Sequence, residues 1–150
     1  MDLLVVIMDN LTVAMTGHQE TPESSSSPSG RKFKPVPIEA LVGQIADSVW
    51  VIDPYDLKNS VEAFRRALRA EGLRVVISRR ACALLVKPKR RAVVDEERCV
   101  GCLKCIKELG CPAMRLSGGR PEIIADACLG CGLCAQVCPV GAIKLVPVER

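Results

Sequence analysis

The chain has 150 residues and a formal net charge of +4, and its hydrophobic and charged shares of 49% and 25% are near ordinary globular values. The longest apolar stretch near the start, Leu3 to Met8, is too short to span a bilayer and lacks the flanks of a signal peptide, which predicts a cytoplasmic protein with no membrane association. Nucleic-acid binding is not expected, because the basic run at 87–91 has no aromatic neighbours that could stack on bases.

Residues 1–86 alternate between strand and helix patterns. Strand patterns occupy Leu3–Met8, Val49–Ile52 and Leu73–Ser78. Helical spacing occupies Ile38–Asp47 and Leu57–Glu71. Strands that alternate with helices predict a parallel sheet and an α/β fold for this part of the chain.

Individual residues refine these elements. The run Leu3–Met8 is apolar throughout, which suits a strand buried on both faces. Asp56 is expected to cap the second helix and Gly72 to end it. Its buried face is predicted to carry Val61, Phe64 and Leu68. The Ser- and Pro-rich stretch Thr21–Gly30 predicts a loop.

Residues 87–91 are predicted to be a basic linker, and residues 92–150 a second, smaller unit with an internal repeat. Strands are expected at 92–94, 114–116, 121–125 and 143–147, and short helices at 103–109 and 133–137. So small a unit buries little apolar area, so metal–thiolate bonds are expected to hold much of it together. Its candidate shielding residues are Ile106, Leu116, Ile123, Ile124, Val137 and Ile143.

Eight of the nine cysteines form two runs with the same opening. The runs are Cys99-x2-Cys102-x2-Cys105-x5-Cys111-Pro112 and Cys128-x2-Cys131-x2-Cys134-x3-Cys138-Pro139. This spacing is typical of the ligands of two cubane [4Fe–4S] clusters. A disulfide framework fits poorly, since the cysteine count is odd, and structural zinc favours separated pairs over triplets. The longer spacing before Cys111 predicts a bulge at 106–110.

The two runs resemble those of bacterial two-cluster ferredoxins, in which the last cysteine of each run ligates the other cluster. The resemblance implies an α+β two-cluster ferredoxin domain. One cluster would be held by Cys99, Cys102, Cys105 and Cys138. The other would be held by Cys128, Cys131, Cys134 and Cys111. Cys82 lies outside both runs in an apolar stretch and is expected to be a small buried hydrophobic residue.

The segment from Met8 to Gln19, which follows an apolar strand, resembles the thiamine-diphosphate segment of 2-oxoacid:ferredoxin oxidoreductases of the indolepyruvate type. Residues 51–56 and 75–80 resemble that family too, as does a C-terminal two-cluster domain. The resemblance extends over nearly the whole chain. It implies a partial thiamine-diphosphate-binding-type domain at 1–86 and makes the chain the C-terminal part of a longer α subunit.

The resemblance also implies site residues for thiamine diphosphate and Mg2+. Asn10 and the backbone carbonyl of Thr12 would ligate the metal, as hard oxygen donors do. The cofactor would be lined by Thr16, Gly17, His18 and Gln19. Taken alone, an asparagine after a strand is a common turn residue, and His18 an ordinary loop histidine. The family's Gly-Asp motif lies further upstream than the nine residues before Asn10 allow, so we expect both groups to bind only if a longer chain or a partner completes the site.

The family implies oxidative decarboxylation of an aryl pyruvate with coenzyme A, which gives an aryl-acetyl-CoA, CO2 and two electrons. The clusters would pass these electrons singly to a ferredoxin, and a partner subunit of the oxidoreductase is expected. The residues also allow a second class of protein, a stand-alone electron carrier whose α/β half is a docking domain. A structural zinc module is a distant third.

Overall fold

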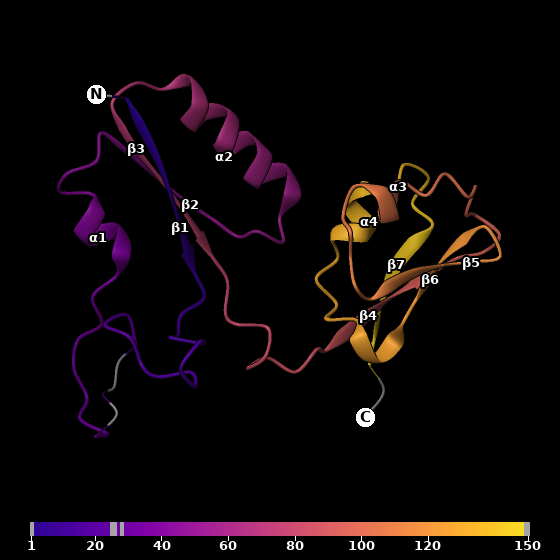
Figure 1. Ribbon diagram of the computed structural model, residues 1–150, viewed down its shortest axis with the longest axis horizontal. Coiled ribbons are helices and arrows are strands. Elements are labelled where there is room, and N and C mark those ends of the chain that lie inside the picture. The colour runs from indigo at the N-terminus through magenta and orange to yellow at the C-terminus, as the bar shows by residue number, and fades with distance from the viewer. Residues whose placement is uncertain (1, 25–26, 28, 149–150) are drawn as a thin grey trace. The chain divides into compact units, whose positions relative to one another are not determined.

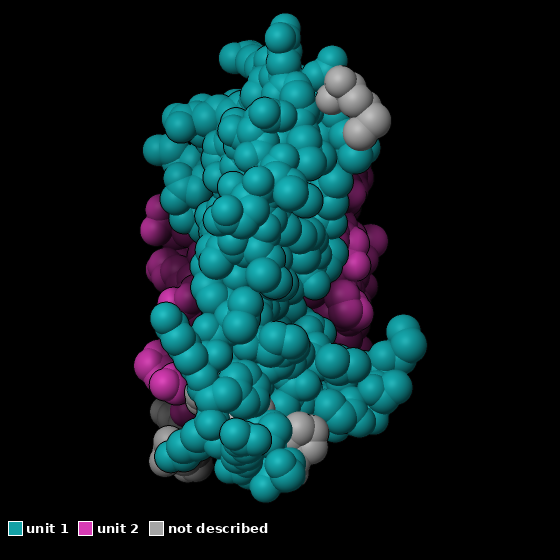
Figure 2. All heavy atoms as spheres, turned by 90° about the vertical axis from the view of Figure 1, so that its left-hand side faces the viewer, with its two compact units in different colours: residues 1–86 teal, residues 87–150 magenta. Residues whose placement is uncertain are grey.

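The computed structural model describes residues 2–24, 27 and 29–148. The chain divides into two compact units, Met1–Val86 and Lys87–Arg150, which are teal and magenta in Figure 2. Each unit has its own hydrophobic core. Within the described residues, neither unit has a helix of the length and apolarity that crossing a membrane requires.

The first unit is built on a parallel sheet of three strands, as expected from the alternating pattern (Figure 1). The strands are β1 (Leu3–Asp9), β2 (Ser48–Ile52) and β3 (Leu73–Arg79), in the order β1-β3-β2. Because the strands are parallel, their carboxyl ends meet at one edge of the sheet, where open α/β sheets commonly bind ligands. The segment that follows β1 therefore begins at that edge.

The prediction that the first strand is buried on both faces is wrong. β3 is the central strand, and five of its residues in succession, 74–78, are buried. β1 lies at the edge of the sheet, and its Val6 and Met8 side chains are 42% and 79% exposed. An unbroken apolar run indicates a strand, but strand order decides which run becomes central, and strand order is not a local property.

Helix α2 (Leu57–Arg69) packs on one face of this sheet. Asp56 caps it as expected, since its carboxylate accepts a hydrogen bond from the Asn59 N–H at 3.1 Å. The core between helix and sheet contains Ile52, Ala63, Ala67 and Val76, with Leu4, Trp50 and Phe64 packed against it. The predicted buried face is wrong in two of its three residues, because the exposed fractions of Val61 and Leu68 are 39% and 69%. Small side chains instead allow the helix to lie close to the sheet.

Helix α1 (Ile38–Val42) ends five residues earlier than the sequence predicts. Gly43 ends it, and Asp47 is bound to the start of β3 instead. The Asp47 carboxylate accepts a hydrogen bond from the Leu73 N–H at 2.7 Å, and the Asp47 N–H donates to the Leu73 carbonyl at 2.8 Å. The described residues of the expected loop 21–30 contain no helix or strand, and residues 25, 26 and 28 of that loop lie outside the described residues.

The second unit contains two antiparallel strand pairs and two short helices (Figure 1). β4 (Arg90–Val94) pairs with β7 (Ile143–Pro147), and β5 (Met114–Ser117) pairs with β6 (Arg120–Ile123). The helices are α3 (Lys104–Lys107) and α4 (Leu133–Val137), and a 3-10 turn, η1 (Ala125–Ala127), was not expected. The core contains Ala92, Cys105, Cys134 and Ile143.

Two expectations for the second unit need correction. The last two residues of the expected linker 87–91 belong to β4, because Arg90 and Arg91 pair with Pro147 and Val146. Two of the six candidate shielding residues, Leu116 and Ile124, are 58% and 37% exposed, whereas the other four belong to the core or pack against it. Leu116 lies on the solvent-facing side of the two-stranded hairpin β5–β6, and Ile124 lies beyond the end of β6, before η1.

Candidate functional site

The first expected cysteine quartet lines one cavity. Three of its thiols belong to the first run: those of Cys99 and Cys102, in the loop after β4, and that of Cys105, in α3. The fourth thiol is that of Cys138, which directly follows α4. The remaining walls are mainly apolar: Val100, Leu103, Pro121, Pro139, Val140, Ala142 and Ile143. The cavity is narrow, about 10 Å³.

The second expected quartet lines a separate and larger cavity of about 220 Å³. Cys128, Cys131 and Cys134 come from the second loop and α4, and Cys111 comes from the segment after α3. Most of the remaining lining is apolar, including Leu109, Pro112, Ala113, Met114, Ile123 and Leu133. Each cavity thus combines three thiols from one run with the last thiol of the other.

The backbone of the two loops follows the same path. In the first, Gly101 and Leu103 have φ of +67° and +58°; in the second, Gly130 and Gly132 have φ of +65° and +81°. Left-handed residues at these alternate positions curl each loop back on itself, which turns its three thiols toward one side. The third cysteine of each run then lies in the short helix that follows.

The longer spacing before Cys111 is accommodated after α3. The Gly110 N–H donates to the Ile106 carbonyl at 3.0 Å, and Gly110 has φ of +55°. The Met114 N–H then donates to the Cys111 carbonyl at 3.0 Å, which forms a turn immediately before β5. The two extra residues therefore lengthen the end of the helical segment.

Burial raises the pKa of two of the thiols. Desolvation, with the neighbouring Cys131 and Cys128 thiols, raises the pKa of Cys134 to about 11, and desolvation also raises the pKa of Cys105. Two other cysteines of the quartets accept hydrogen bonds from backbone N–H groups. Ala92 N–H donates to Cys128 Sγ, with an N–S distance of 3.4 Å, and Ala142 N–H donates to Cys138 Sγ, with an N–S distance of 3.3 Å. A cationic iron–sulfur core would supply the positive charge that four such thiolates require.

A single-ion site is a different geometry. Four thiolates on one zinc ion lie within about 4 Å of one another, as bonds of about 2.3 Å require, whereas each thiolate of a cubane binds its own iron. In the part of the chain that the structure describes, no three or more His, Cys, Asp or Glu side chains are placed to hold a single metal ion. Each quartet surrounds a cavity instead.

The expected thiamine residues lie in the segment that follows β1. Asn10 Oδ1 accepts a hydrogen bond from the Thr12 N–H at 3.1 Å, so a tight turn places the two expected metal ligands together. The segment then closes on itself, because Val13 and Gln19 form an antiparallel bridge and the Thr12 hydroxyl donates to the Gln19 carbonyl at 3.1 Å. Thr16 also bonds to the Gln19 side chain, at 2.6 Å.

His18 points toward Cys82, and Cys82 is not the buried residue that the sequence predicts. Cys82 is half-buried, and its Sγ lies 3.6 Å from Nε2 of His18. The Cys82 N–H donates to the Asn10 carbonyl at 3.1 Å, so the chain after β3 supports the turn after β1. Apolar neighbours in the sequence do not bury a residue that follows the end of a strand.

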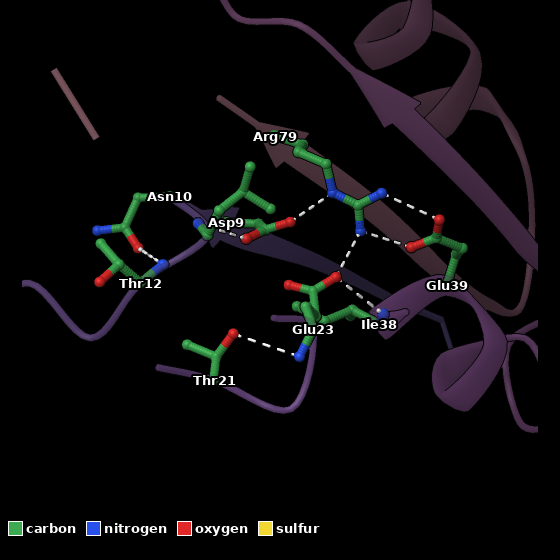
Figure 3. Close-up of polar contacts among 9 residues, drawn as sticks. Asp9, Asn10, Thr12, Thr21, Glu23, Ile38, Glu39 and Arg79 are labelled. Atoms are coloured by element: carbon green, nitrogen blue, oxygen red, sulfur yellow. Dashed lines mark hydrogen bonds and ion pairs between the residues drawn. The ribbon is translucent and has the colours of Figure 1, made fainter. Parts of the chain in front are cut away.

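Sequence reasoning missed a charge network at this edge of the sheet. Figure 3 shows the guanidinium of Arg79 between three carboxylates, those of Asp9, Glu23 and Glu39. The distances from guanidinium nitrogens to the nearest carboxylate oxygens are 2.5, 2.8 and 2.5 Å, in the same order. The signal that could have revealed the Asp9 pair is that Asp9 and Arg79 end two strands that pair in register.

The network connects three segments to the turn at Asn10. Asp9 Oδ1 accepts from the Leu11 N–H at 2.9 Å, while Glu23 also accepts from the Ile38 N–H at 3.2 Å, where α1 begins. Arg79 therefore holds β1, the loop before α1 and α1 itself at the carboxyl edge of the sheet. Its own pKa is raised by these carboxylates, chiefly Glu39, so it stays charged.

The pH dependence of this network gives a testable prediction. The hydrogen bonds from Arg79 lower the pKa of Glu39 from 4.5 to about 2. Because the folded-state pKa lies below the unfolded one, the stabilisation is fully present above about pH 4.5 and is lost as the pH falls toward 2. We expect Glu39→Gln to flatten the acid dependence of stability in that window by less than about 1 kcal/mol, since a surface pair is screened by water.

Fluorescence of Trp50, the single tryptophan, during urea unfolding reports on the first unit alone. Arg79→Gln should flatten the same window, because Arg79 is the main cause of the shift. If the free energy of unfolding falls equally steeply with pH between 4.5 and 2 in the wild type and in Glu39→Gln, the lowered pKa of Glu39 is contradicted.

Comparison with known proteins divides the chain in the same way. Residues 1–78 match a family described as thiamine pyrophosphate enzyme, C-terminal TPP binding domain, and residues 92–145 match a family described as 4Fe-4S dicluster domain. These family models agree with the expected order of a thiamine-type α/β part and a cluster part.

Curated relatives extend over both parts. "Indolepyruvate oxidoreductase subunit IorA" of Pyrococcus horikoshii is 42% identical over 155 aligned positions, covering 97% of this chain and 24% of the relative. The protein of that name from Methanothermobacter marburgensis is 42% identical over 144 positions, covering 94% and 23%. "Pyruvate synthase subunit PorD" of the latter organism is 44% identical over 52 residues, 35% of this chain and 60% of its own length. The chain spans about a quarter of the length of the two indolepyruvate oxidoreductase relatives.

Proposed function

This chain belongs to the thiamine pyrophosphate enzyme family, and from that premise we propose that it transfers electrons through two [4Fe–4S] clusters within an indolepyruvate-type 2-oxoacid:ferredoxin oxidoreductase. Its similarity to indolepyruvate oxidoreductase subunits supports the kind of enzyme, and the dicluster domain supports the electron path. The complete reaction would oxidise an aryl pyruvate with coenzyme A to an aryl-acetyl-CoA and CO2. It releases two electrons, which one-electron clusters deliver to a ferredoxin in two steps.

The observation that carries this proposal is the crossed grouping of the cysteines. Cys99 of the first run and Cys138 of the second run line one cavity. Cys128 of the second run and Cys111 of the first run line the other. Two metal sites built from one run each would not need this exchange. The donor set of four thiols with apolar walls fits a cubane cluster, since shielding from water and hydrogen bonds to sulfur are what tune such a centre.

The first unit supports a thiamine-type role for the turn after β1. Asn10 Oδ1 and the Thr12 carbonyl are hard oxygen donors on one turn, which is what Mg2+ prefers, and the turn lies at the carboxyl edge of a parallel sheet. Thiamine diphosphate supplies the carbanion chemistry of decarboxylation when it is bound. Thr16, Gly17, His18 and Gln19 would line it, and the hairpin-like closure from Val13 to Gln19 holds them in one loop.

Anaerobic reconstitution of the chain with iron and sulfide tests the proposal. We expect about eight irons and eight acid-labile sulfides per chain, as two four-iron clusters require. Dithionite reduction should bleach the visible absorbance and give the EPR spectrum of two reduced clusters. A product that is colourless and binds zinc in place of iron would overturn the proposal.

A partner chain separates the enzyme from the stand-alone carrier. With a chain that supplies the upstream thiamine motif, aryl pyruvate and coenzyme A should reduce a viologen dye, and the chain alone should not. Intact clusters without dye reduction in either case would remove the enzyme role and leave electron transfer in place.

A further inference from the structure

The two cysteine quartets differ in their access to solvent. Cys102 is exposed, whereas its counterpart in the second loop, Cys131, is half-buried, and the other six members of the quartets are half-buried or buried. The neighbour of Cys102 in the first loop, Val100, is 67% exposed. Cys102 is therefore the most exposed member of either quartet.

The two loops also differ in charge. Residues 128–138 contain no charged residue, whereas α3 presents Lys104 and Lys107 within five residues of Cys102. Lys104 lies 3.7 Å from Glu108, and with side chains about half exposed such a pair keeps most of its hydration. Among the other acidic groups of this loop, Asp95 is bound by Lys144 at 3.0 Å. Glu96 and Glu97 are exposed, and Arg120 donates to the backbone carbonyl of Glu96, at 2.8 Å, and not to its carboxylate.

We propose that the cluster held by Cys99, Cys102, Cys105 and Cys138 is the electron outlet, and that the surface of Val100, Cys102, Lys104 and Lys107 docks an acidic one-electron carrier protein. The proposal rests on the proposed function. Transient electron-transfer complexes are small and use charge to speed their encounter, whereas the cores of lasting interfaces are depleted of charge. The charged first loop suits the former, and the uncharged second loop suits contact with a permanent neighbour.

The transfer is a single outer-sphere electron step. The cluster that Cys99, Cys102, Cys105 and Cys138 would hold would supply one electron, its charge rising from 1+ to 2+, and the carrier would gain that electron. No bond forms or breaks, and no proton is required. The rate therefore depends on how often the two proteins meet, on the distance between their centres and on the driving force. Surface charge mainly changes the rate at which they meet.

The internal repeat offers a matched pair of variants. Lys107 and Gln136 are both exposed, and each follows the third cysteine of its run by two residues. Lys107→Gln and Gln136→Glu each make the surface more negative by one charge. We would reconstitute both chains anaerobically, reduce them, mix them with an oxidised acidic ferredoxin in a stopped-flow instrument, and measure the second-order rate constant.

We expect Lys107→Gln to slow the reaction about threefold at low salt, and Gln136→Glu to leave it within the error of the wild type. The difference should vanish at about 0.5 M salt, where charges are screened within a few ångströms. Added negative charge lowers the potential of a nearby cluster and so raises the driving force, so a slower reaction reports docking. Equal rates for both variants, a slower Gln136→Glu, or a wild-type rate that rises with salt would each overturn the proposal. Iron, sulfide and EPR assays of each chain distinguish these results from failure of the proposed function, which would show as absent clusters.

Discussion

Replacing Cys138 by alanine should remove the cluster of the first cysteine run and leave the cluster of the second. Cys138 follows Cys134 in the sequence by four residues, yet it lines the cavity of Cys99, Cys102 and Cys105. With only three thiolates left, the fourth corner of the cubane has no protein ligand, so we expect the whole cluster to be lost and the iron content to fall from about eight to about four per chain. Low-temperature EPR of the reduced protein should then lose the spin–spin coupling between two clusters.

Double substitutions identify which cluster is lost. Cys99→Ala combined with Cys138→Ala should lose no more iron than either change alone, because both residues belong to one quartet. Cys128→Ala combined with Cys138→Ala should lose nearly all of it. Cys82→Ala serves as the control, since Cys82 lies in the first unit, and it should retain both clusters. The reverse pattern for the two double substitutions would show that each run holds its own cluster and would refute the crossed arrangement.

The elements with strong local patterns could be predicted from the sequence. The five expected strands and helices of the first unit are all present, and the cap at Asp56 is where the sequence places it. What failed depended on partners distant in the chain. The start of β3 binds Asp47 outside α1, and the contact with the sheet selects Ala63 and Ala67 over the larger apolar residues of α2. Ends of elements respond to such contacts more than their centres do.

The candidate sites divide in the same way. Ligand spacing in a cysteine run is a local property, so the sequence could group the first three thiols of each cavity, whereas the fourth thiol, from the other run, was expected from the resemblance to two-cluster ferredoxins. The Arg79 network has no local pattern, since its three carboxylates come from a strand, a loop and a helix that lie 40 to 70 residues away in the sequence. Only the pairing of β1 with β3 brings Asp9 to Arg79. The ligand roles themselves stay predictions, and the substitutions above test them.

Gly130→Ala should be among the most damaging single changes in the second unit. Gly130 has φ of +65°, where an alanine is strained by about 1–2 kcal/mol. Its added Cβ would also overlap the carbonyl oxygen of Arg90 and lie 2.9 Å from the carbonyl carbon, and both atoms belong to β4. Because backbone atoms cannot turn aside as a side chain can, the cluster loop or the strand must shift. Strain and overlap together should lower the free energy of unfolding by more than about 3 kcal/mol.

Gly101→Ala is the matched control, because Gly101 occupies the same place in the first loop with φ of +67°, and its nearest contact, the Gly119 carbonyl oxygen, is 3.7 Å away. It carries the left-handed strain without the overlap, so the difference between the two variants isolates the contact with β4. Both should be compared by the urea concentration at which the visible cluster absorbance of the reconstituted protein is lost. We expect a much lower midpoint for Gly130→Ala than for Gly101→Ala. Similar midpoints would mean that β4 does not pack against the second loop at Gly130, and the cavity around Cys128, Cys131 and Cys134 would then need a different wall.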